Sequence, residues 1–453
     1  MKKGLFLVLI LLFGVTSVAM AAPPPTTTIT PVVNVSQQGS MLVFTKIDVS
    51  NFCSSGAPEA IPCTTAGSPC GATCIATLYP ADDTTPCSAP GAYCVTSFGN
   101  AGVCSPNPGT CEAARDTIVS ITNSGPAPVN VHCYWINGKD QQPHDFTLEL
   151  TAHHPVVFDA RYGVGEFPFL LGYPVFTSPF NINGDGNVGE LKCFAVDTAT
   201  GTKQIKWNYL TGTAKTIDYL AAPPTAYEYN AWSFAGIPKT NTLVCAGSPT
   251  VSCPYLGGTC ADGSLCIDAG NGASIGTPGT ILMDGTQYSA CPAYWQSNFF
   301  ASGAGQFISP VWIPDSDLTL VPCKEDVRQN HAFTYTKAVF TVWDELETPH
   351  SGSYQCMECF YEDFLTKVGF DAPNTTNPGN FFTLANLGTI VGYFRVQGVA
   401  DQSKCATIPG ITMVNSPLLG LLVEEVEILG DISKTATTGF TFGTDPSGSL
   451  IWH

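Results

Sequence analysis

Clustered cysteines constrain the fold of this chain more than any other feature. The 453 residues include 19 cysteines, and three groups of four lie in short stretches rich in Gly, Ser, Thr and Pro. One of these stretches, residues 245–266, reads CAGSPTVSCPYLGGTCADGSLC. Such stretches hold few large apolar side chains to bury, so we expect covalent cross-links to hold them together.

The N-terminus indicates the compartment in which these cysteines lie. Two lysines precede an apolar run, and Ala19 and Ala21 fit the small-residue rule for signal-peptide cleavage. We expect residues 1–21 to be a signal peptide and residues 22–40 to be a Pro/Thr-rich linker. The mature protein would then be secreted or displayed on a bacterial cell surface, with the periplasm as the alternative. Cysteines in these oxidising compartments form disulfides.

The spacing of the cysteines argues against haem and metal. The Cys-x-x-Cys sequence that ends at Cys359 is followed by Phe360 rather than His, which excludes covalent c-type haem. The cysteines of residues 245–266 are too widely spaced for the paired ligands of a zinc site. The disulfide candidates in this stretch are Cys245, Cys253, Cys260 and Cys266.

The three cysteine groups have related spacings. They read C-x9-C-x6-C-x3-C from Cys53, C-x6-C-x9-C-x6-C from Cys87 and C-x7-C-x6-C-x5-C from Cys245. We interpret them as copies of a small disulfide-held module. Two copies form an insertion at residues 51–114, and the third lies at residues 241–279. Loops on a rigid sheet often carry function, and reinforcement against proteases is an equally good explanation.

Short strand patterns separated by Gly, Pro and Asn fill most of the remaining chain. In VNVHCYW, from Val129 to Trp135, apolar and polar residues alternate, whereas helical periodicity is rare. The pattern predicts an all-β fold of two antiparallel, immunoglobulin-like β-sandwich domains with small disulfide-rich insertions. The first domain spans residues 41–240 and the second spans residues 280–453.

Cys133 and Cys193 lie in the middle of predicted strands. We expect them to form a disulfide that crosses the core and joins the two sheets of the first sandwich, with Trp135 packed beside it. Because the cysteine count is odd, one thiol is expected to be free or to pair between chains.

The sequence NINGDGNVGE resembles the calcium loop of EF-hand and dockerin-type proteins. Asn183 and Asp185 match the third and fifth positions, and Asn187 could offer its carbonyl. Asn181 stands where an Asp is usual, and Glu190 replaces the bidentate Glu from a shifted position. Calcium is the one cofactor that the sequence suggests. The alternative is a tight Asn-Gly turn that leads into a strand.

No catalytic site emerges, and we expect the protein not to be an enzyme. Ser274 lies in GASIG, but the strand and helix that flank a nucleophile elbow are missing. Asp344, Glu345 and Glu347 could supply carboxylates for glycoside hydrolysis, although a charged strand end is the better explanation. Aromatic residues could form a sugar-stacking platform, but core packing is more common for such side chains. They are Tyr227, Tyr229, Trp232, Trp343, Tyr354 and Tyr361.

The charge of the chain limits its partners. Its formal charge is −18 and only 12% of its residues are charged, which disfavours nucleic acid and anionic lipid. After the signal peptide, no apolar run is long enough to span a membrane. The remaining partners are other extracellular proteins, further copies of this chain, and glycans.

Several segments together resemble exported bacterial proteins that pair a β-sandwich with a second half. These segments are MLVFTKIDV, DTIVSITNSG, VNVHCYW, GELKC, LTLVPCKED and SYQCMECF. The resemblance covers most of the mature chain and implies no known activity. We therefore predict a non-enzymatic structural or interaction protein for adhesion, extracellular matrix or filament assembly, or ligand display. The alternative is a secreted carbohydrate-binding protein or hydrolase.

Overall fold

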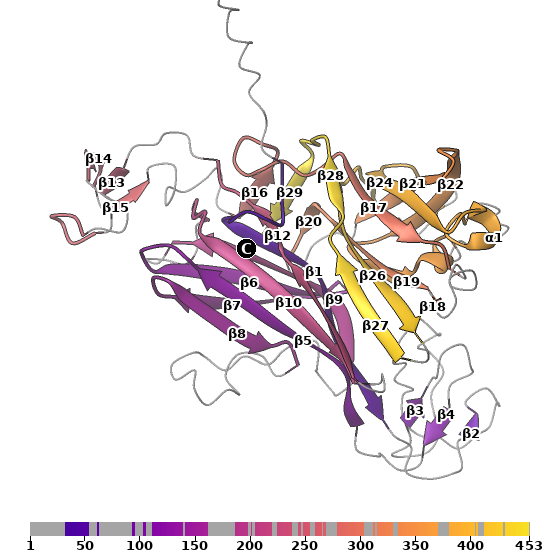
Figure 1. Cartoon of the computed structure of the whole chain (residues 1–453). Helices are drawn as coiled ribbons and strands as arrows, with labels where there is room; N and C mark the ends of the chain where they lie inside the picture. The colour runs from indigo at the N-terminus through magenta and orange to yellow at the C-terminus, as the bar shows by residue number, and fades with distance from the viewer. Residues whose placement is uncertain are drawn as a thin grey trace, which may run out of the picture. The chain divides into compact units, whose positions relative to one another are not determined.

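A computed structural model shows the arrangement of the strands (Figure 1). It describes residues 32–53, 61–62, 93–95, 103–105, 111–138, 141–161, 186–197, 201, 204–219, 224–237, 243–245, 248–253, 259–264, 266–268, 279–302, 311–312, 315–328, 334–369, 380–403, 405, 412–428 and 431–452. The predicted signal peptide lies outside these residues.

The described chain is nearly all β, as predicted. Its helical content is limited to the single turn α1 (Leu384–Leu387) and a 3-10 turn at Leu365–Lys367. Nearly all strand pairs are antiparallel, as in β6 with β7 and β21 with β24; β20 with β29 and β21 with β25 are parallel.

The largest sheet has nine strands and contains most of the first half of the chain. Seven strands follow the order β11-β10-β5-β1-β9-β6-β7, while β12 pairs with β1 and β8 pairs with β5. The strands are β1 (Met41–Cys53), β5 (Cys111–Asn123), β6 (Val129–Asn137), β7 (Pro143–Leu150), β8 (His154–Asp159), β9 (Gly186–Val196), β10 (Leu210–Asp218), β11 (Thr225–Asn230) and β12 (Trp232–Phe234).

The second half forms two larger sheets and a small one. The six-stranded sheet contains β17 (Tyr294–Phe300), β21 (Thr334–Asp344), β22 (Pro349–Met357), β24 (Val391–Val399), β25 (Thr412–Met413) and β28 (Phe440–Phe442). The five-stranded sheet contains β18 (Val311–Trp312), β19 (Ser316–Pro322), β23 (Tyr361–Phe364), β26 (Leu418–Ile428) and β27 (Asp431–Thr437). The small sheet contains β16 (Thr280–Met283), β20 (Lys324–Asp326) and β29 (Gly448–Ile451).

The cysteine-rich stretches form small sheets of their own. One consists of β2 (Ile61–Pro62), β3 (Tyr93–Val95) and β4 (Val103–Ser105), and another of β13 (Leu243–Cys245), β14 (Ser248–Ser252) and β15 (Cys266–Asp268). The chain leaves β1 and returns into β5 with Cys53 opposite Cys111. The two ends of the predicted insertion thus lie on neighbouring strands of the large sheet, and the insertion itself stays a prediction.

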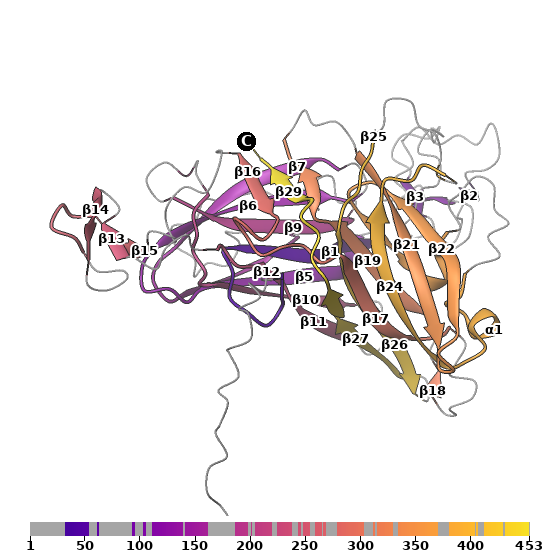
Figure 2. The same cartoon turned by 90° about the horizontal axis from the view of Figure 1, so that it is seen from above.

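Both faces of the central strands β1, β6 and β9 of the large sheet are buried, whereas the outer strands β7, β8 and β11 expose one face. Along β1, Leu42 and Phe44 belong to one apolar cluster, and Met41 and Val43 belong to another, because successive side chains of a strand point to opposite faces. The cluster around Met41 also contains Trp295 and other core residues of the second half. β1 accordingly lies beside β19 and β26 (Figure 2). Residues 31–453 form one compact unit, and their division into two domains stays a prediction.

The end of the expected linker belongs to this core. The Val33 side chain is buried in the same cluster as Met41, and the Val33 backbone N–H donates to Ala290 O at 3.0 Å. Gly39 and Leu210 exchange two backbone hydrogen bonds. The apolar Val33 thus fixes residues 32–40 to the fold, and the linker predicted to end at residue 40 ends earlier.

Cys133 and Cys193 form a disulfide, but its geometry differs from the prediction. The two residues lie opposite each other on the neighbouring strands β6 and β9, with Cα atoms 4.0 Å apart. The bond therefore joins two strands within one sheet and does not cross between sheets. A spacing this short fits the positions of an antiparallel pair that are not joined by hydrogen bonds. Trp135 packs in the same cluster, as predicted.

We expect the Cys133→Ala/Cys193→Ala variant to lose stability because its unfolded chain is less constrained. For a sequence separation of 60 residues, the loss in free energy of unfolding should be about 4 kcal/mol. Denaturant titration measures it. The control is Cys359→Ala, which removes a buried sulfur without removing a cross-link and should cost only about 1 kcal/mol. Equal losses in the two variants would contradict a role for the cross-link.

Candidate functional site

Most of the predicted calcium loop lies outside the described residues. This holds for Asn181, Asn183 and Asp185 and for the side chain of Asn187. Glu190 is described, and it is fully buried in β9. Its Oε1 accepts a hydrogen bond from Lys192 Nζ at 3.2 Å, and its Oε2 lies 3.1 Å from the same nitrogen. The Glu190 carboxylate is therefore paired with the Lys192 ammonium inside the protein. Calcium binding by the remainder of the loop stays a prediction.

The third cysteine group forms two interlocked disulfides, as predicted. Cys245 pairs with Cys260, and Cys253 pairs with Cys266, so the first cysteine joins the third and the second joins the fourth. The sulfur atoms of Cys245, Cys253 and Cys260 lie within 4.8 Å of one another. This closeness follows from the packing of two disulfides, and sulfur in a disulfide offers no thiolate to a metal.

Two further disulfides and one thiol account for the five cysteines that follow Cys266 in the sequence. Cys291 pairs with Cys323, Cys356 pairs with Cys405, and Cys359 is the unpaired cysteine among the described residues. The Cys359 thiol donates to Gln141 Oε1 at 2.8 Å, and burial raises its pKa well above the usual value. Because the thiolate is the reactive form, this thiol is chemically quiet at neutral pH. The odd cysteine predicted from the sequence is thus a buried one.

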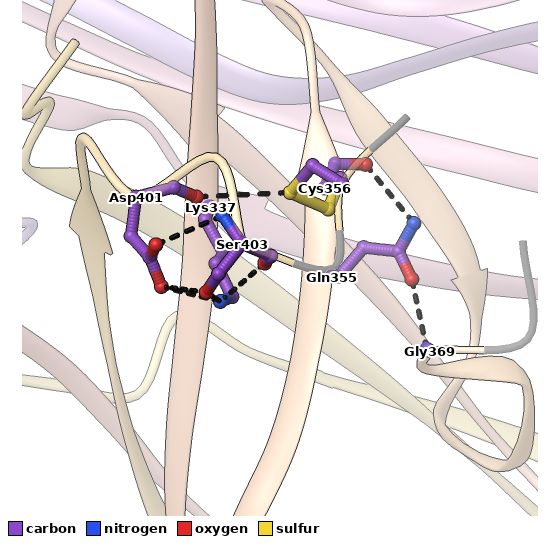
Figure 3. Close-up of a disulfide and its surroundings, with 7 residues drawn as sticks. Lys337, Gln355, Cys356, Gly369, Asp401 and Ser403 are labelled. Atoms are coloured by element: carbon purple, nitrogen blue, oxygen red, sulfur yellow. Dashed lines mark hydrogen bonds and ion pairs between the residues drawn. A yellow bond between two sulfur atoms is a disulfide. The ribbon is translucent and has the colours of Figure 1, made fainter. Parts of the chain in front are cut away.

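The disulfide of Cys356 fixes the chain after β24 to the neighbouring strands (Figure 3). Beside it, Lys337 Nζ donates to Asp401 Oδ2 at 2.6 Å and to Ser403 O at 2.8 Å. Gln355 Oε1 accepts from the backbone N–H of Gly369 at 2.9 Å. Covalent, ionic and neutral contacts converge here, so this edge of the six-stranded sheet is rigid.

The predicted sugar-stacking and carboxylate groups are mostly structural. Asp344 accepts backbone N–H bonds from Leu346 and Thr348 and contacts His350 Nε2 at 3.2 Å, so it orders the turn between β21 and β22. Five of the six aromatic residues are buried, in line with the core interpretation. They are Tyr227, Tyr229, Trp232, Tyr354 and Tyr361.

Trp343 is different, because it lies on the outer face of the six-stranded sheet. Its neighbour Val342 is buried, and Trp295 and Phe394 of the adjacent strands are buried too. Since side chains alternate along a strand, the residues beside them point outward. They form a surface that we call the aromatic face. Its members are Tyr294, Gln296, Trp343, Tyr393, Arg395, Phe440 and Phe442.

A guanidinium group connects the rings of the aromatic face. The Arg395 guanidinium lies 4.7 Å from the ring centre of Tyr294 and 5.1 Å from that of Trp343. Phe442 extends the row on one side, 6.4 Å from Tyr294, and Tyr393 extends it on the other, 5.3 Å from Trp343. Cation–π contacts hold such groups in place while leaving ring surface open to a ligand.

The β28 end of this face is the most exposed. Phe440 is 64% exposed and Phe442 is 60% exposed, although both are large apolar residues. Among the described strands, β28 pairs only with β17 and forms the edge of the sheet. Arg395 Nε has no hydrogen-bond partner among the described residues. The face thus offers exposed rings and a strand edge, which together suit binding.

Comparisons with known proteins give no family for this arrangement. No model of a known protein family matches the chain, and no curated protein resembles it in sequence. Within the described residues, no helix combines the length and apolar character needed to cross a membrane.

A buried carboxyl pair near the base of the insertion was not evident from the sequence. Asp116 is hydrogen-bonded to Asp159, and its Oδ2 lies 3.5 Å from Arg161 Nε. Burial, followed by the charge of Asp159, raises the pKa of Asp116 to about 7 despite the opposing effect of Arg161. The stability contributed by the protonated carboxyl is therefore fully present below about pH 4 and is lost as the pH rises through about 7.

We expect Asp116→Asn, which mimics the protonated carboxyl, to gain stability relative to the wild type as the pH rises from about 5 to about 8. Denaturant titrations at both pH values measure the difference. Asp401→Asn is the control. The hydrogen bond from Lys337 lowers the pKa of Asp401, so this carboxylate is ionised in both folded and unfolded chains above about pH 5. Its effect should be constant, and a constant effect for Asp116→Asn would contradict the prediction.

Proposed function

We propose that the protein is an exported, non-enzymatic interaction protein that binds a partner protein through the aromatic face. The observation that carries this proposal is the exposure of Phe440 and Phe442 beside a row of Tyr, Trp and Arg side chains. Protein interfaces concentrate their binding energy in these residue types. A strand edge at β28 adds backbone groups that a partner strand can pair with.

Export is the second part of the proposal. Five disulfides are present among the described residues, and such cross-links persist in oxidising compartments. The signal-peptide pattern of residues 1–21 supports the same location. An immunoglobulin-like arrangement of the sheets also belongs to the proposal. Trp135 beside the Cys133–Cys193 disulfide supports it, whereas the position of that disulfide within one sheet does not.

Glycan binding is the second candidate function, because the aromatic face also contains hydrogen-bonding groups. The Tyr393 hydroxyl donates to Gln296 Oε1 at one edge of the row. Rings bordered by such groups suit the alternating apolar and hydroxyl surfaces of a sugar. The seven residues that define the face include no carboxylate, so it gives no support to a hydrolase.

To test the proposal, a photo-reactive amino acid replaces Phe442 in one variant and Val251 in another. Val251 is 51% exposed in the third cysteine group and serves as the matched control. We expect a protein adduct on producing cells from position 442 and not from position 251. The Phe440→Ser/Phe442→Ser variant should then bind that purified partner at least about tenfold more weakly than Val251→Ser does.

Two outcomes would contradict partner-protein binding. The first is equal affinity of the two serine variants for the identified partner. The second is an adduct from position 442 that contains only glycan, which would favour the alternative function.

A further inference from the structure

Lys46 is a buried lysine that contacts two carboxylates from the other half of the chain. Its side chain is 1% exposed, in the middle of β1. Its Nζ contacts Asp317 Oδ2 of β19 and lies 2.8 Å from Glu362 Oε1 of β23. β19 and β23 are paired neighbours, with Thr319 opposite Glu362. Two strands of the five-stranded sheet thus present their carboxylates to one amine of the large sheet.

We call Lys46, Asp317 and Glu362 the triad, and their charges do not balance. One ammonium cannot neutralise two largely buried carboxylates, whose side chains are 18% and 13% exposed, so we infer that one proton stays on the acids. Burial, and then the charge of Asp317, raises the pKa of Glu362, which identifies Glu362 as the protonated member. Burial alone lowers the pKa of Lys46, but Asp317 and Glu362 outweigh it and raise that pKa. The site therefore holds an amine, a carboxyl electrophile and a proton carrier in direct contact.

The polar atoms of the triad are incompletely satisfied. An ammonium has three N–H donors, and Lys46 Nζ has two described acceptors. Asp317 Oδ1 is buried and has no hydrogen-bond partner among the described residues. Buried ions with unmet hydrogen bonds are costly, and a neutral product at the same position would remove that cost.

We propose that Lys46 and Asp317 form an intramolecular amide cross-link, with Glu362 transferring the protons. The Lys46 ammonium first gives a proton to the Asp317 carboxylate, which leaves a neutral amine and a carboxylic acid. The amine attacks Asp317 Cγ, a carbon–nitrogen bond forms, and the carbon–oxygen bond to the hydroxyl breaks. Glu362 takes a proton from the nitrogen and gives one to the leaving hydroxyl, so it ends as it began and one water is released.

The fold favours this condensation in two ways. Fixed contact between amine and carboxyl replaces a bimolecular encounter, which corresponds to a very high effective concentration. Burial also withholds the water that would reverse the reaction. Nothing is oxidised or reduced, and no co-reactant is needed.

A second lysine, Lys192 of β9, provides an internal comparison. Its Nζ contacts Glu325 and is also bonded to Glu190 of its own strand and to Pro322 O at 3.3 Å. All three of its N–H donors therefore have acceptors. We infer that Lys192 remains an ion cluster while Lys46 reacts.

Mass spectrometry of the full exported chain tests the proposal. After reduction and alkylation, we expect an intact mass lower than the sequence predicts by one water, and a branched peptide that joins Lys46 to Asp317. Lys46→Arg should restore the full mass. Glu362→Gln should slow bond formation about 100-fold or more. Lys192→Arg is the matched control and should still lose one water.

Asp317→Asn gives a second test that does not depend on removing the lysine. Condensation of Lys46 with an Asn side chain releases ammonia, so this variant should lose the mass of one ammonia instead of one water. A full mass for the folded wild-type chain would overturn the proposal. So would a water loss that persists in Lys46→Arg and disappears in Lys192→Arg. The mass is independent of the aromatic face, so failure here leaves the proposed binding function standing.

Discussion

Burial of both faces of the central strands β1 and β9 of the nine-stranded sheet is the constraint on which the rest of the structure depends. A strand with one face in water can place its charged residues there, but β1 and β9 have no such face. Their charged side chains Lys46, Asp48, Glu190 and Lys192 are all buried. Each must therefore find partners inside the protein, because an isolated buried charge is too costly. Each of the two lysines has at least one carboxylate partner from the second half, so these two ion clusters form only where the two halves pack together.

The acidic composition of the chain shapes these clusters. At Lys46 and at Lys192, one cation faces two carboxylates, and Arg161 likewise faces Asp116 and Asp159. Burial and a neighbouring carboxylate raise the pKa of Glu362, Glu190 and Asp116. Clusters with more carboxyl groups than cations therefore retain protons. These clusters therefore contribute most to the free energy of unfolding at mildly acidic pH. They also hold protons where a condensation reaction can use them.

The sequence predicts local features well and long-range neighbours poorly. Alternation in VNVHCYW correctly places Trp135 and Cys133 in one apolar cluster. Alternation cannot tell which strand becomes the neighbour, so the Cys133–Cys193 bond was expected between sheets and lies within one. The partners of Lys46 are 271 and 316 residues away in sequence, and no local pattern connects them. For the aromatic face, strand alternation predicts that Tyr294 and Trp295 point to opposite faces of the sheet. It does not reveal which of the two is buried.

The described disulfides and the proposed amide act over different distances. The disulfides join residues 13 to 60 positions apart, and each lies within one half of the chain or within the third cysteine group. None of these five bonds connects the large sheet to the aromatic face. If a partner pulls on that face, the load reaches the large sheet through side-chain packing, which yields when β19 separates from β1. An amide between Lys46 and Asp317 lies at this junction, so it would make this non-covalent connection between the two halves covalent.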